Sequence, residues 1–293
     1  MKIYHSPRYE VREIAQALLD NVNPLLFKLD FFKANIRSAG VETLAPALKA
    51  NQSLAELDLT SNGIDDDGAI ALAHVLRANK TLRTLILKDN RISDTGALVL
   101  IESLQMNMSI SRIDLSNNSI TSESNSAFGE LFKLSRYIVY ANLGGNPKLL
   151  DAPTLGMIAG ALKLNKTLTE LSLQDGGNID DDGAAELAEM LKENSTLTCL
   201  RLTNNKITDK GVIALAGALQ TNFGLERLFL DGNVFEDRGI EALQFAFRMN
   251  SSLVEYVGPG GPLPPKMGLF GTRGAPQEVK ERSRTSESTC KQQ

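Results

Sequence analysis

The stretch Leu54-Ala-Glu-Leu-Asp-Leu-Thr-Ser-Asn62 decides the fold, because its pattern returns along most of the chain. Apolar residues occupy its first, fourth and sixth places, and an asparagine occupies its ninth. A pattern that returns at a fixed spacing is typical of solenoid proteins, in which each repeat is one structural unit. Clear copies of the pattern stand at 82–90, 110–118, 197–205 and 225–233.

Weaker copies fill the intervals between the clear ones. They begin at Leu26, Ile138 and Leu168, and the copy at Leu168 has its asparagine displaced to Asn178. A last half-copy begins at Leu253. The spacing of about 28 residues therefore predicts eight units followed by a terminal strand.

Each unit has two halves with different hydrophobic periods. The first half alternates apolar and polar residues, which predicts a short strand. The second half carries apolar residues at helical spacing, as at Ala71, Leu72, Val75 and Leu76, and a turn with a glycine precedes it. The chain therefore predicts an α/β solenoid of alternating strands and helices.

Two columns of polar residues mark the ends of the predicted helices. Two residues before the turn glycines stands a Ser or Asp; Ser122 occupies the same place in its unit, and Asp151 does so after a two-residue shift. We expect this column to cap the helix that follows it. Three residues before the start of most units an asparagine recurs, which suits the left-handed conformation at a helix C-terminus. The first column is Ser38, Asp66, Asp94, Ser122, Asp151, Asp181, Asp209 and Asp237, and the second is Asn23, Asn51, Asn79, Asn107, Asn165, Asn194, Asn222 and Asn250.

The strand pattern also predicts the core. Leucines at the first, fourth and sixth places should point inward, together with an isoleucine at the eleventh place, as in Ile64 and Ile92. The asparagine at the ninth place should form a buried ladder that bonds the backbone where the chain leaves the strand. An unpaired buried amide would cost about 1–3 kcal/mol, so this column implies satisfied hydrogen-bond partners.

One segment taken alone resembles a calcium loop. Asn178, Asp180, Asp182, Gly183 and Glu189 fit the liganding and glycine places of an EF-hand loop. An EF-hand loop lies between two helices, however, whereas this segment follows a predicted strand. Its acidic centre also occupies the place that the turns hold in the other units. We therefore interpret it as helix capping and predict no metal site and no cofactor.

The repeated unit, with its Leu-x-x-Leu-x-Leu-x-x-Asn strand and glycine-led helix, resembles the ribonuclease-inhibitor class of leucine-rich repeats over about residues 10–257. The same unit occurs in Ran GTPase-activating protein and in the repeat regions of NOD-like receptors, and the tropomodulin C-terminal domain is a looser relative. The resemblance implies a horseshoe with parallel strands on its concave face and helices on its convex face. Because this class serves many partners, the resemblance indicates the fold more than the function.

The same pattern divides the chain into three parts. Residues 1–25 should form an N-terminal capping helix, since residues 8–21 read as one amphipathic helix without a strand of its own. Residues 26–257 carry the repeats. Residues 258–293 are rich in Pro, Gly and Ser and predict a disordered tail, in which Pro262-Leu-Pro-Pro265 is either a linker or a polyproline ligand.

Composition excludes several classes of function. The net charge of −4 argues against a nucleic-acid partner, which would require clustered Lys and Arg. The two cysteines, Cys199 and Cys290, stand far apart and suggest neither a disulfide framework nor a zinc site. The sequence shows no apolar run of the length of a signal peptide or membrane span. We therefore expect a soluble, cytoplasmic protein that does not act on membranes.

The candidate binding residues are those on the strands that do not pack the core. The third and fifth places of each strand should face the concave side, and Arg and aromatic residues gather there, as is typical of binding hot spots. We predict a protein partner bound there, and we expect neither Arg227 nor Phe229 to fill the core. The alternative is a solvated sheet face with incidental charges. The predicted binding residues are Arg112 and Tyr140, and a second cluster of Arg201, Arg227, Phe229 and Tyr256.

Catalysis has little support in the sequence. No phosphate-binding loop or hydrolase motif occurs in the sequence. His74 falls on the predicted outer face of a helix. Cys199 is expected on the concave face, where no neighbouring base would activate its thiol, so we interpret it as a contact residue. The resemblance leaves open a GTPase-activating protein of the Ran type, for which Arg91 in a strand-to-helix loop is the best match to the catalytic arginine. It also leaves open a tropomodulin-like actin contact. We favour a non-enzymatic interaction module.

Overall fold

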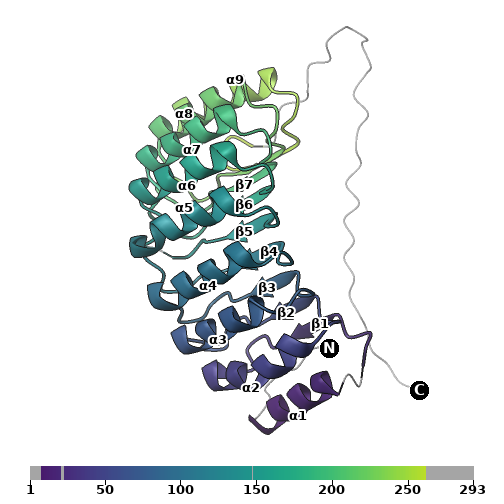
Figure 1. Cartoon of the computed structure of the whole chain (residues 1–293). Coiled ribbons are helices and arrows are strands. Elements are labelled where there is room, and N and C mark those ends of the chain that lie inside the picture. Colours follow the sequence, from purple (N-terminus) through teal and green to yellow (C-terminus); the bar gives the residue numbers. More distant parts are fainter. Residues whose placement is uncertain (1–7, 21–22, 147, 262–293) are drawn as a thin grey trace, which may run out of the picture.

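The computed structural model describes residues 8–20, 23–146 and 148–261 (Figure 1). Strands and α-helices alternate strictly over this part of the chain. The strands are β1 Lys28–Asp30, β2 Glu56–Asp58, β3 Thr84–Ile86, β4 Arg112–Asp114, β5 Tyr140–Asn142, β6 Glu170–Ser172, β7 Cys199–Arg201, β8 Arg227–Phe229 and β9 Glu255–Val257. The helices are α1 Arg8–Leu19, α2 Arg37–Ala50, α3 Asp66–Leu76, α4 Asp94–Met106, α5 Asn125–Leu134 with the short 3₁₀ turn η1 Ser122–Ser124 before it, α6 Ala152–Leu164, α7 Asp181–Glu193, α8 Asp209–Leu219 and α9 Asp237–Met249.

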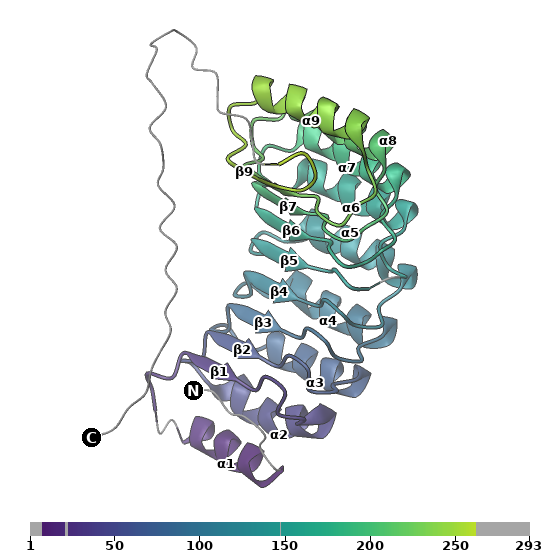
Figure 2. The same cartoon turned by 180° about the vertical axis from the view of Figure 1, so that it is seen from behind.

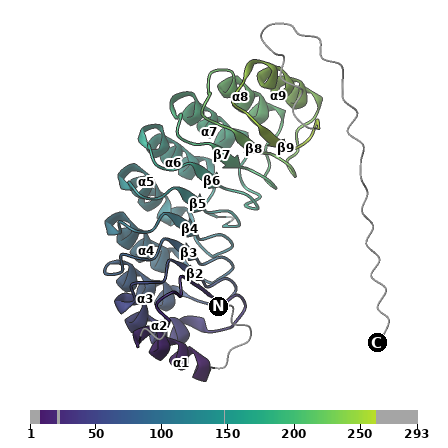
Figure 3. The ribbon, with the colours of Figure 1, turned by 90° about the vertical axis from the view of Figure 1, so that its right-hand side faces the viewer.

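The described strands form one open parallel sheet in the order β1 to β9. Each strand pairs with the next one along the chain, so that equivalent places of neighbouring repeats lie side by side, as Arg112 does beside Tyr140. The sheet lines the inner side of an arc and the helices form its outer layer (Figures 2 and 3). This arrangement confirms the predicted solenoid, with strands on the concave face and helices on the convex face.

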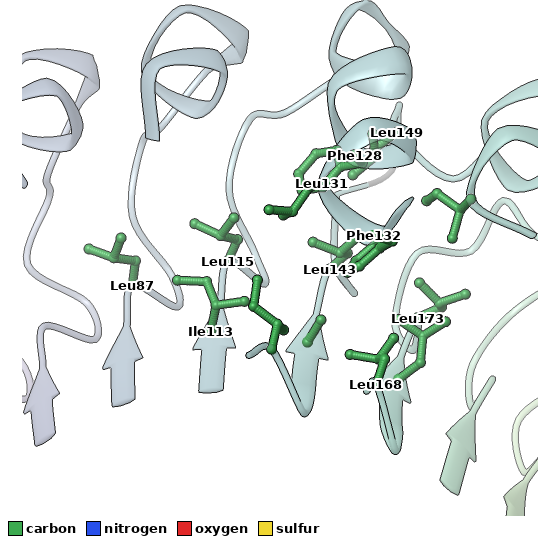
Figure 4. Close-up of a cluster of buried hydrophobic side chains, with 14 of the residues drawn as sticks. Leu87, Ile113, Leu115, Phe128, Leu131, Phe132, Leu143, Leu149, Leu168 and Leu173 are labelled. Atoms are coloured by element: carbon green, nitrogen blue, oxygen red, sulfur yellow. The ribbon is translucent and has the colours of Figure 1, made fainter. Parts of the chain in front are cut away.

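A continuous apolar core lies between the sheet and the helices. Leu57, Leu59 and Ile64 are fully buried, which confirms the predicted inward places, and each such side chain contributes about 1.5–3 kcal/mol on burial. Helix α5 directs Phe128 and Leu131 into the core that also contains Leu143, the residue after β5 (Figure 4). No single unit has enough partners for its own apolar face, so the core forms only when neighbours stack.

The ninth-place asparagines form the predicted buried ladder. In Asn90 the side-chain oxygen accepts from the N–H groups of Asn62 and Ile64 at 3.1 and 3.0 Å, and the amide nitrogen donates to the carbonyls of Leu59 and Leu87 at 3.0 and 2.9 Å. Each ladder asparagine therefore ties the turn of the preceding repeat to its own strand.

The expectation that Asn178 replaces a ladder asparagine is wrong. The ninth place of its repeat is held by Gly176, a buried residue without a side chain to donate or accept. Among the described residues Asn178 has no hydrogen-bonded side-chain partner, and it is half-exposed. The ladder is therefore interrupted between the repeats that contain Asn146 and Asn205.

The asparagines before the strands are not left-handed, contrary to expectation. Asn51 has φ −68° and ψ 137°, which is an extended conformation. Its side-chain oxygen accepts from Leu54 N–H at 2.7 Å, and in the next repeat the amide of Asn79 donates to the Leu48 carbonyl at 2.7 Å. The column therefore forms a second ladder, which satisfies the last carbonyls of each preceding helix.

The Ser/Asp column does not cap its own helices, which corrects a second expectation. Asp66 accepts from the N–H groups of Ser93 and Gly96 at 2.8 and 3.0 Å, at the start of α4 in the following repeat. Asp94, Asp181 and Asp209 act in the same way on the repeat after their own. In α7 and α8 the residue before the column position caps the helix instead, since the Asp180 side chain accepts from Gly183 N–H and the Thr208 side chain accepts from Lys210 N–H. The shifted Asp151 does cap its own helix, because it accepts from Thr154 N–H within α6. The carboxylates of Asp66, Asp94, Asp181 and Asp209 therefore each join two repeats.

The residues that resemble calcium ligands are engaged in these contacts. The Asp180 side chain caps α7 by accepting from Gly183 N–H at 3.1 Å, while Glu189 pairs with Lys192 at 2.5 Å. Asp181, which lies between the proposed ligands, accepts from Thr208 N–H and Gly211 N–H of the next repeat, each at 2.8 Å. The carboxylates therefore point to helix termini and to a lysine.

We expect Asp181→Ala to lower the free energy of unfolding by about 0.5–2 kcal/mol, the usual range for loss of a cap. Because its carboxylate accepts from α8, amide hydrogen exchange should accelerate at Gly211 and stay unchanged at Gly183 of α7. Asp180→Ala is the matched control and should give the opposite pattern. Faster exchange at Gly183 in Asp181→Ala would contradict the contact between repeats.

The stabilisation by Asp181 should also depend on pH. Burial raises the pKa of its carboxyl, but hydrogen bonds from the Thr208 hydroxyl and the N–H groups of Thr208 and Gly211 outweigh burial and hold the pKa below its ordinary value of 3.8. The folded state therefore binds this proton more weakly than the unfolded state. The contribution is complete at neutral pH, declines as the pH approaches the ordinary value, and is lost as the pH falls through the lowered pKa.

The two ends of the repeat array differ. Helix α1 adds Val11, Ala15 and Leu18 to the common core, next to the first full repeat. At the other end β9 has one neighbouring strand, and residues 258–261 follow it as a turn. The predicted tail lies outside the described residues from residue 262 onward. Among the described helices, none combines the length and apolar character needed to cross a membrane.

Candidate functional site

The concave face carries a band of polar and aromatic side chains from the third and fifth places of β4 to β8. We define the concave band as Arg112, Tyr140, Glu170, Arg201, Arg227 and Phe229. Since inward residues occupy the fourth and sixth places, these side chains project from the opposite face of the sheet. The band therefore contains five of the six predicted binding residues.

Arg112 and Tyr140 form the first pair of the band. The guanidinium carbon of Arg112 lies 4.1 Å from the centre of the Tyr140 ring, within the range of a cation–π contact. Burial, and then the nearby Asp114 carboxylate, raise the pKa of Tyr140 against the opposing effect of Arg112. The predicted neighbourhood of these two residues is confirmed, because equivalent places of adjacent strands are in register.

Arg201 and Phe229 form the second pair. The guanidinium carbon of Arg201 lies 3.9 Å from the centre of the Phe229 ring. Phe229 is only 8% exposed, because the arginine covers it. Phe229 lies outside the main core cluster, as expected, but it is a covered residue whose removal would also disturb its arginine.

Arg227 reaches across β7 to Glu170 on β6, where its guanidinium nitrogen lies 3.3 Å from the carboxylate oxygen. Between the two strands stands Cys199, which is fully buried. Burial raises the pKa of the Cys199 thiol, opposed by Arg201 and Arg227. The expectation that Cys199 is a concave contact residue is therefore wrong. The sequence analysis did not predict Glu170 as a member of this site, because its partner Arg227 lies two strands away rather than on the adjacent strand.

Tyr256 does not belong to the concave band, which corrects the prediction. It occupies the fourth place of its repeat, pairs in register with the inward Leu228, and is 8% exposed. Its ring packs against Phe247 of α9 at 4.9 Å between centres, and its hydroxyl donates to the Pro259 carbonyl at 2.9 Å. Its side chain closes the C-terminal end of the core.

The fifth place has a structural use that the sequence did not reveal. The carboxylates of Asp30, Asp58 and Asp114 accept from the N–H two residues later at 3.0, 2.9 and 2.9 Å, and Asn142 does the same with Gly144 at 3.1 Å. These side chains stabilise the turn after each strand. Arg201 and Phe229 occupy this place and cannot accept such a bond. The turns therefore provide no structural reason for an arginine and a phenylalanine there.

The residues considered for catalysis lie apart from one another. His74 is exposed on α3, as predicted. Arg91 is exposed after the ladder residue Asn90, and its N–H donates to the Ile64 carbonyl at 2.7 Å. Within the described ranges, no three His, Cys, Asp or Glu side chains are grouped so as to hold a metal ion.

Comparisons with known proteins agree with this architecture. A family model described as a leucine-rich repeat matches residues 50–73, 78–100, 164–188 and 193–216, and a second model of the same description matches residues 109–131. A search of curated proteins gives no match.

Two solved structures are similar over parts of the chain. The actin-binding site 2 of leiomodin-1 shares 25% identity with a TM-score of 0.42, covering 45% of this chain and 76% of that one. The tropomodulin C-terminal domain of Caenorhabditis elegans shares 13% identity with a TM-score of 0.41, covering 63% of this chain and 93% of that one.

The matched segments coincide with the structural repeats. Each contains one strand and at least the first turns of the helix after it, as residues 193–216 do with β7 and α8. Five of the strands of the open parallel sheet are included in this way. The chain therefore carries leucine-rich repeats, and they are built into an open α/β solenoid.

Proposed function

We propose that this chain is a non-enzymatic interaction module of the ribonuclease-inhibitor type of leucine-rich repeat, acting in the cytoplasm and binding a protein partner on its concave band. The observation that carries this proposal is the pair of arginines, Arg112 and Arg201, each stacked on an aromatic ring and neither paired with a carboxylate of the described chain. Arginine and aromatic residues on a pre-formed surface are the types that dominate binding energies at protein interfaces.

The choice of test residues follows from the contacts. Arg227 is paired with Glu170, and its side chain passes over the buried Cys199. The substitution Arg227→Glu would therefore place a second carboxylate next to Glu170 and would expose the Cys199 thiol. Arg112 and Arg201 form no ion pair with the part of the chain that the structure describes, and their Cβ atoms project from the open side of the sheet. Arg201→Glu uncovers the Phe229 ring, so the free energy of unfolding of each variant should be measured beside its binding.

We expect Arg112→Glu with Arg201→Glu to weaken the main partner at least tenfold, about 1.4 kcal/mol. The full chain, immobilised and exposed to native lysate, should capture a protein that the double variant releases, and titration calorimetry with that purified protein would give the Kd. Glu186→Lys, on the exposed side of α7, is the matched charge reversal and should leave the Kd unchanged. Loss of binding in Glu186→Lys with full binding in the double variant would place the site on the helices.

The enzymatic alternative gives a separate expected result. If Arg91 were a catalytic arginine, small amounts of the chain would accelerate GTP hydrolysis by a Ran-type GTPase, and Arg91→Ala would abolish the effect. We expect no acceleration in a single-turnover hydrolysis assay. If the rate of GTP hydrolysis rose about a hundredfold and the increase depended on Arg91, the proposed function would be that of a GTPase-activating protein and not of an interaction module.

Actin is the second alternative, implied by the looser resemblance to tropomodulin. Co-sedimentation of the full chain with filamentous actin tests it directly. Binding that is lost with Arg112→Glu and Arg201→Glu would identify actin as the partner of the concave band. Binding that survives both substitutions would assign actin to another surface.

A further inference from the structure

The two stacked arginines differ from the other charged residues on the concave band. Each guanidinium lies over a ring, Arg112 over Tyr140 at 4.1 Å and Arg201 over Phe229 at 3.9 Å. Stacking uses the face of the guanidinium and leaves its edge, which carries the N–H donors, available for a planar acceptor. The ring also restricts the side chain, so that less conformational freedom is lost when an acceptor binds.

The carboxylates around these arginines are already engaged. Asp114 accepts from Ser116 N–H at 2.9 Å and from the Asn142 amide at 3.0 Å. Glu170 is paired with Arg227 at 3.3 Å, and Asp231 accepts from the Thr203 hydroxyl at 2.8 Å. Among the described residues of β4 to β8, Arg112 and Arg201 are the cations without an ionic partner, and the Asp114 carboxylate, which has no ionic partner either, already accepts from two N–H donors.

The positions of the two arginines set the distance between their binding points. Arg112 stands at the third place of β4 and Arg201 at the fifth place of β7. Three strand spacings of about 4.8 Å and two residues along the strand put their Cα atoms about 16 Å apart. Both side chains lean toward the following strand, as the stacked rings show, so the guanidinium groups keep a similar separation.

We propose that Arg112 and Arg201 receive two carboxylates of one extended acidic segment of the partner. The proposal rests on the proposed function and specifies the chemistry of the bound surface. An extended chain rises about 3.3 Å per residue, so acidic residues about four positions apart lie on one face and span about 13 Å, and their side chains cover the remainder. A helix would need about ten residues for the same span.

A display library of random dodecapeptides panned on the full-length protein tests this proposal. We expect peptides with two Asp or Glu residues about four positions apart to be enriched, and to be lost from the Arg112→Gln, Arg201→Gln double variant. Glu186→Lys should bind the same peptides as the unchanged protein. In the best peptide, changing either acidic residue to its amide should weaken binding about tenfold, since a hydrogen bond between two charged groups is stronger than one to a neutral amide.

A double-mutant cycle makes the assignment specific. Once Arg201→Gln has been introduced, removing the carboxylate that faces it should cause no further loss, while removing the other should still cost about tenfold. Losses that simply multiply for every combination of variants would show that the carboxylates contact other groups, and would overturn the proposal.

The outcomes separate this proposal from the proposed function. The enriched peptides could lack acidic pairs and still fail to bind the variant with Arg112→Glu and Arg201→Glu. That result would support a binding site on the concave band but would overturn the assignment of two carboxylates to the two arginines. Peptides that bind the charge-reversed protein as tightly as the unchanged protein would count against the concave site itself. A library with no enrichment at all would overturn the carboxylate assignment, and the lysate experiment would then decide the concave site by itself.

Discussion

Asn90→Ala should lower the free energy of unfolding by about 3 kcal/mol, although alanine fits the space sterically. Asn90 is 9% exposed, and its amide accepts from the N–H groups of Asn62 and Ile64 and donates to the carbonyls of Leu59 and Leu87. Alanine would leave these buried groups without partners, and each unsatisfied group costs about 1–3 kcal/mol. Urea denaturation followed by circular dichroism would measure the loss.

Asn178→Ala is the matched control for this prediction. Asn178 is half-exposed and lies outside the ladder, because Gly176 holds the ninth place of its repeat. Its replacement should change the free energy of unfolding by no more than about 0.5 kcal/mol, as for ordinary surface substitutions. Equal losses for the two variants would mean that the ladder hydrogen bonds are not what stabilises the turns.

Gly144→Ala should destabilise the solenoid by about 3 kcal/mol, at the upper end of the cost of overpacking. A Cβ atom at this position would lie 2.2 Å from the Gln174 carbonyl oxygen and 3.0 Å from the Gln174 nitrogen of the next repeat. Both are backbone atoms, and the same carbonyl accepts from Gly145 N–H at 2.8 Å. The turn after β5 must therefore move away from the turn after β6 to admit a methyl group.

Gly160→Ala is the control, since it adds the same methyl group where nothing lies within 4 Å. Gly160 is exposed on α6, and alanine there should raise the free energy of unfolding by up to about 1 kcal/mol because it favours the helix. Thermal denaturation of the two variants should move Tm in opposite directions. A Gly144→Ala protein as stable as the original would show that the turns are not in tight contact.

The candidate site could be predicted from the sequence only in part. The pairs Arg112–Tyr140 and Arg201–Phe229 were predictable, because residues one repeat apart at the same place must become neighbours in a parallel sheet. The bridge from Arg227 to Glu170 skips a strand and depends on how far an arginine side chain leans. The burial of Cys199, which lies on the strand between Arg227 and Glu170, could not be predicted from the sequence for the same reason.

The asparagine and aspartate columns show the limit of the sequence most clearly. Their spacing along the chain identified helix ends correctly, since caps require polar side chains at fixed distances from the first and last turns. Which helix each side chain serves could not be read from the spacing. Asp66 is the first residue of α3, but its carboxylate accepts from the N–H groups at the start of α4.

The periodic properties of this protein could be predicted from its amino-acid sequence: strands, helices, inward leucines and the ladder asparagines all follow from local patterns that repeat about every 28 residues. The packing of the repeats was needed to show which repeat each cap serves, that Tyr256 closes the core, and that Arg112 and Arg201 find no ionic partner between residues 8 and 261 where the chain is described. The physical reason is that a backbone pattern depends on near neighbours along the chain. The partner of a long polar side chain depends on which groups of the adjacent repeats come within its reach after the units have stacked.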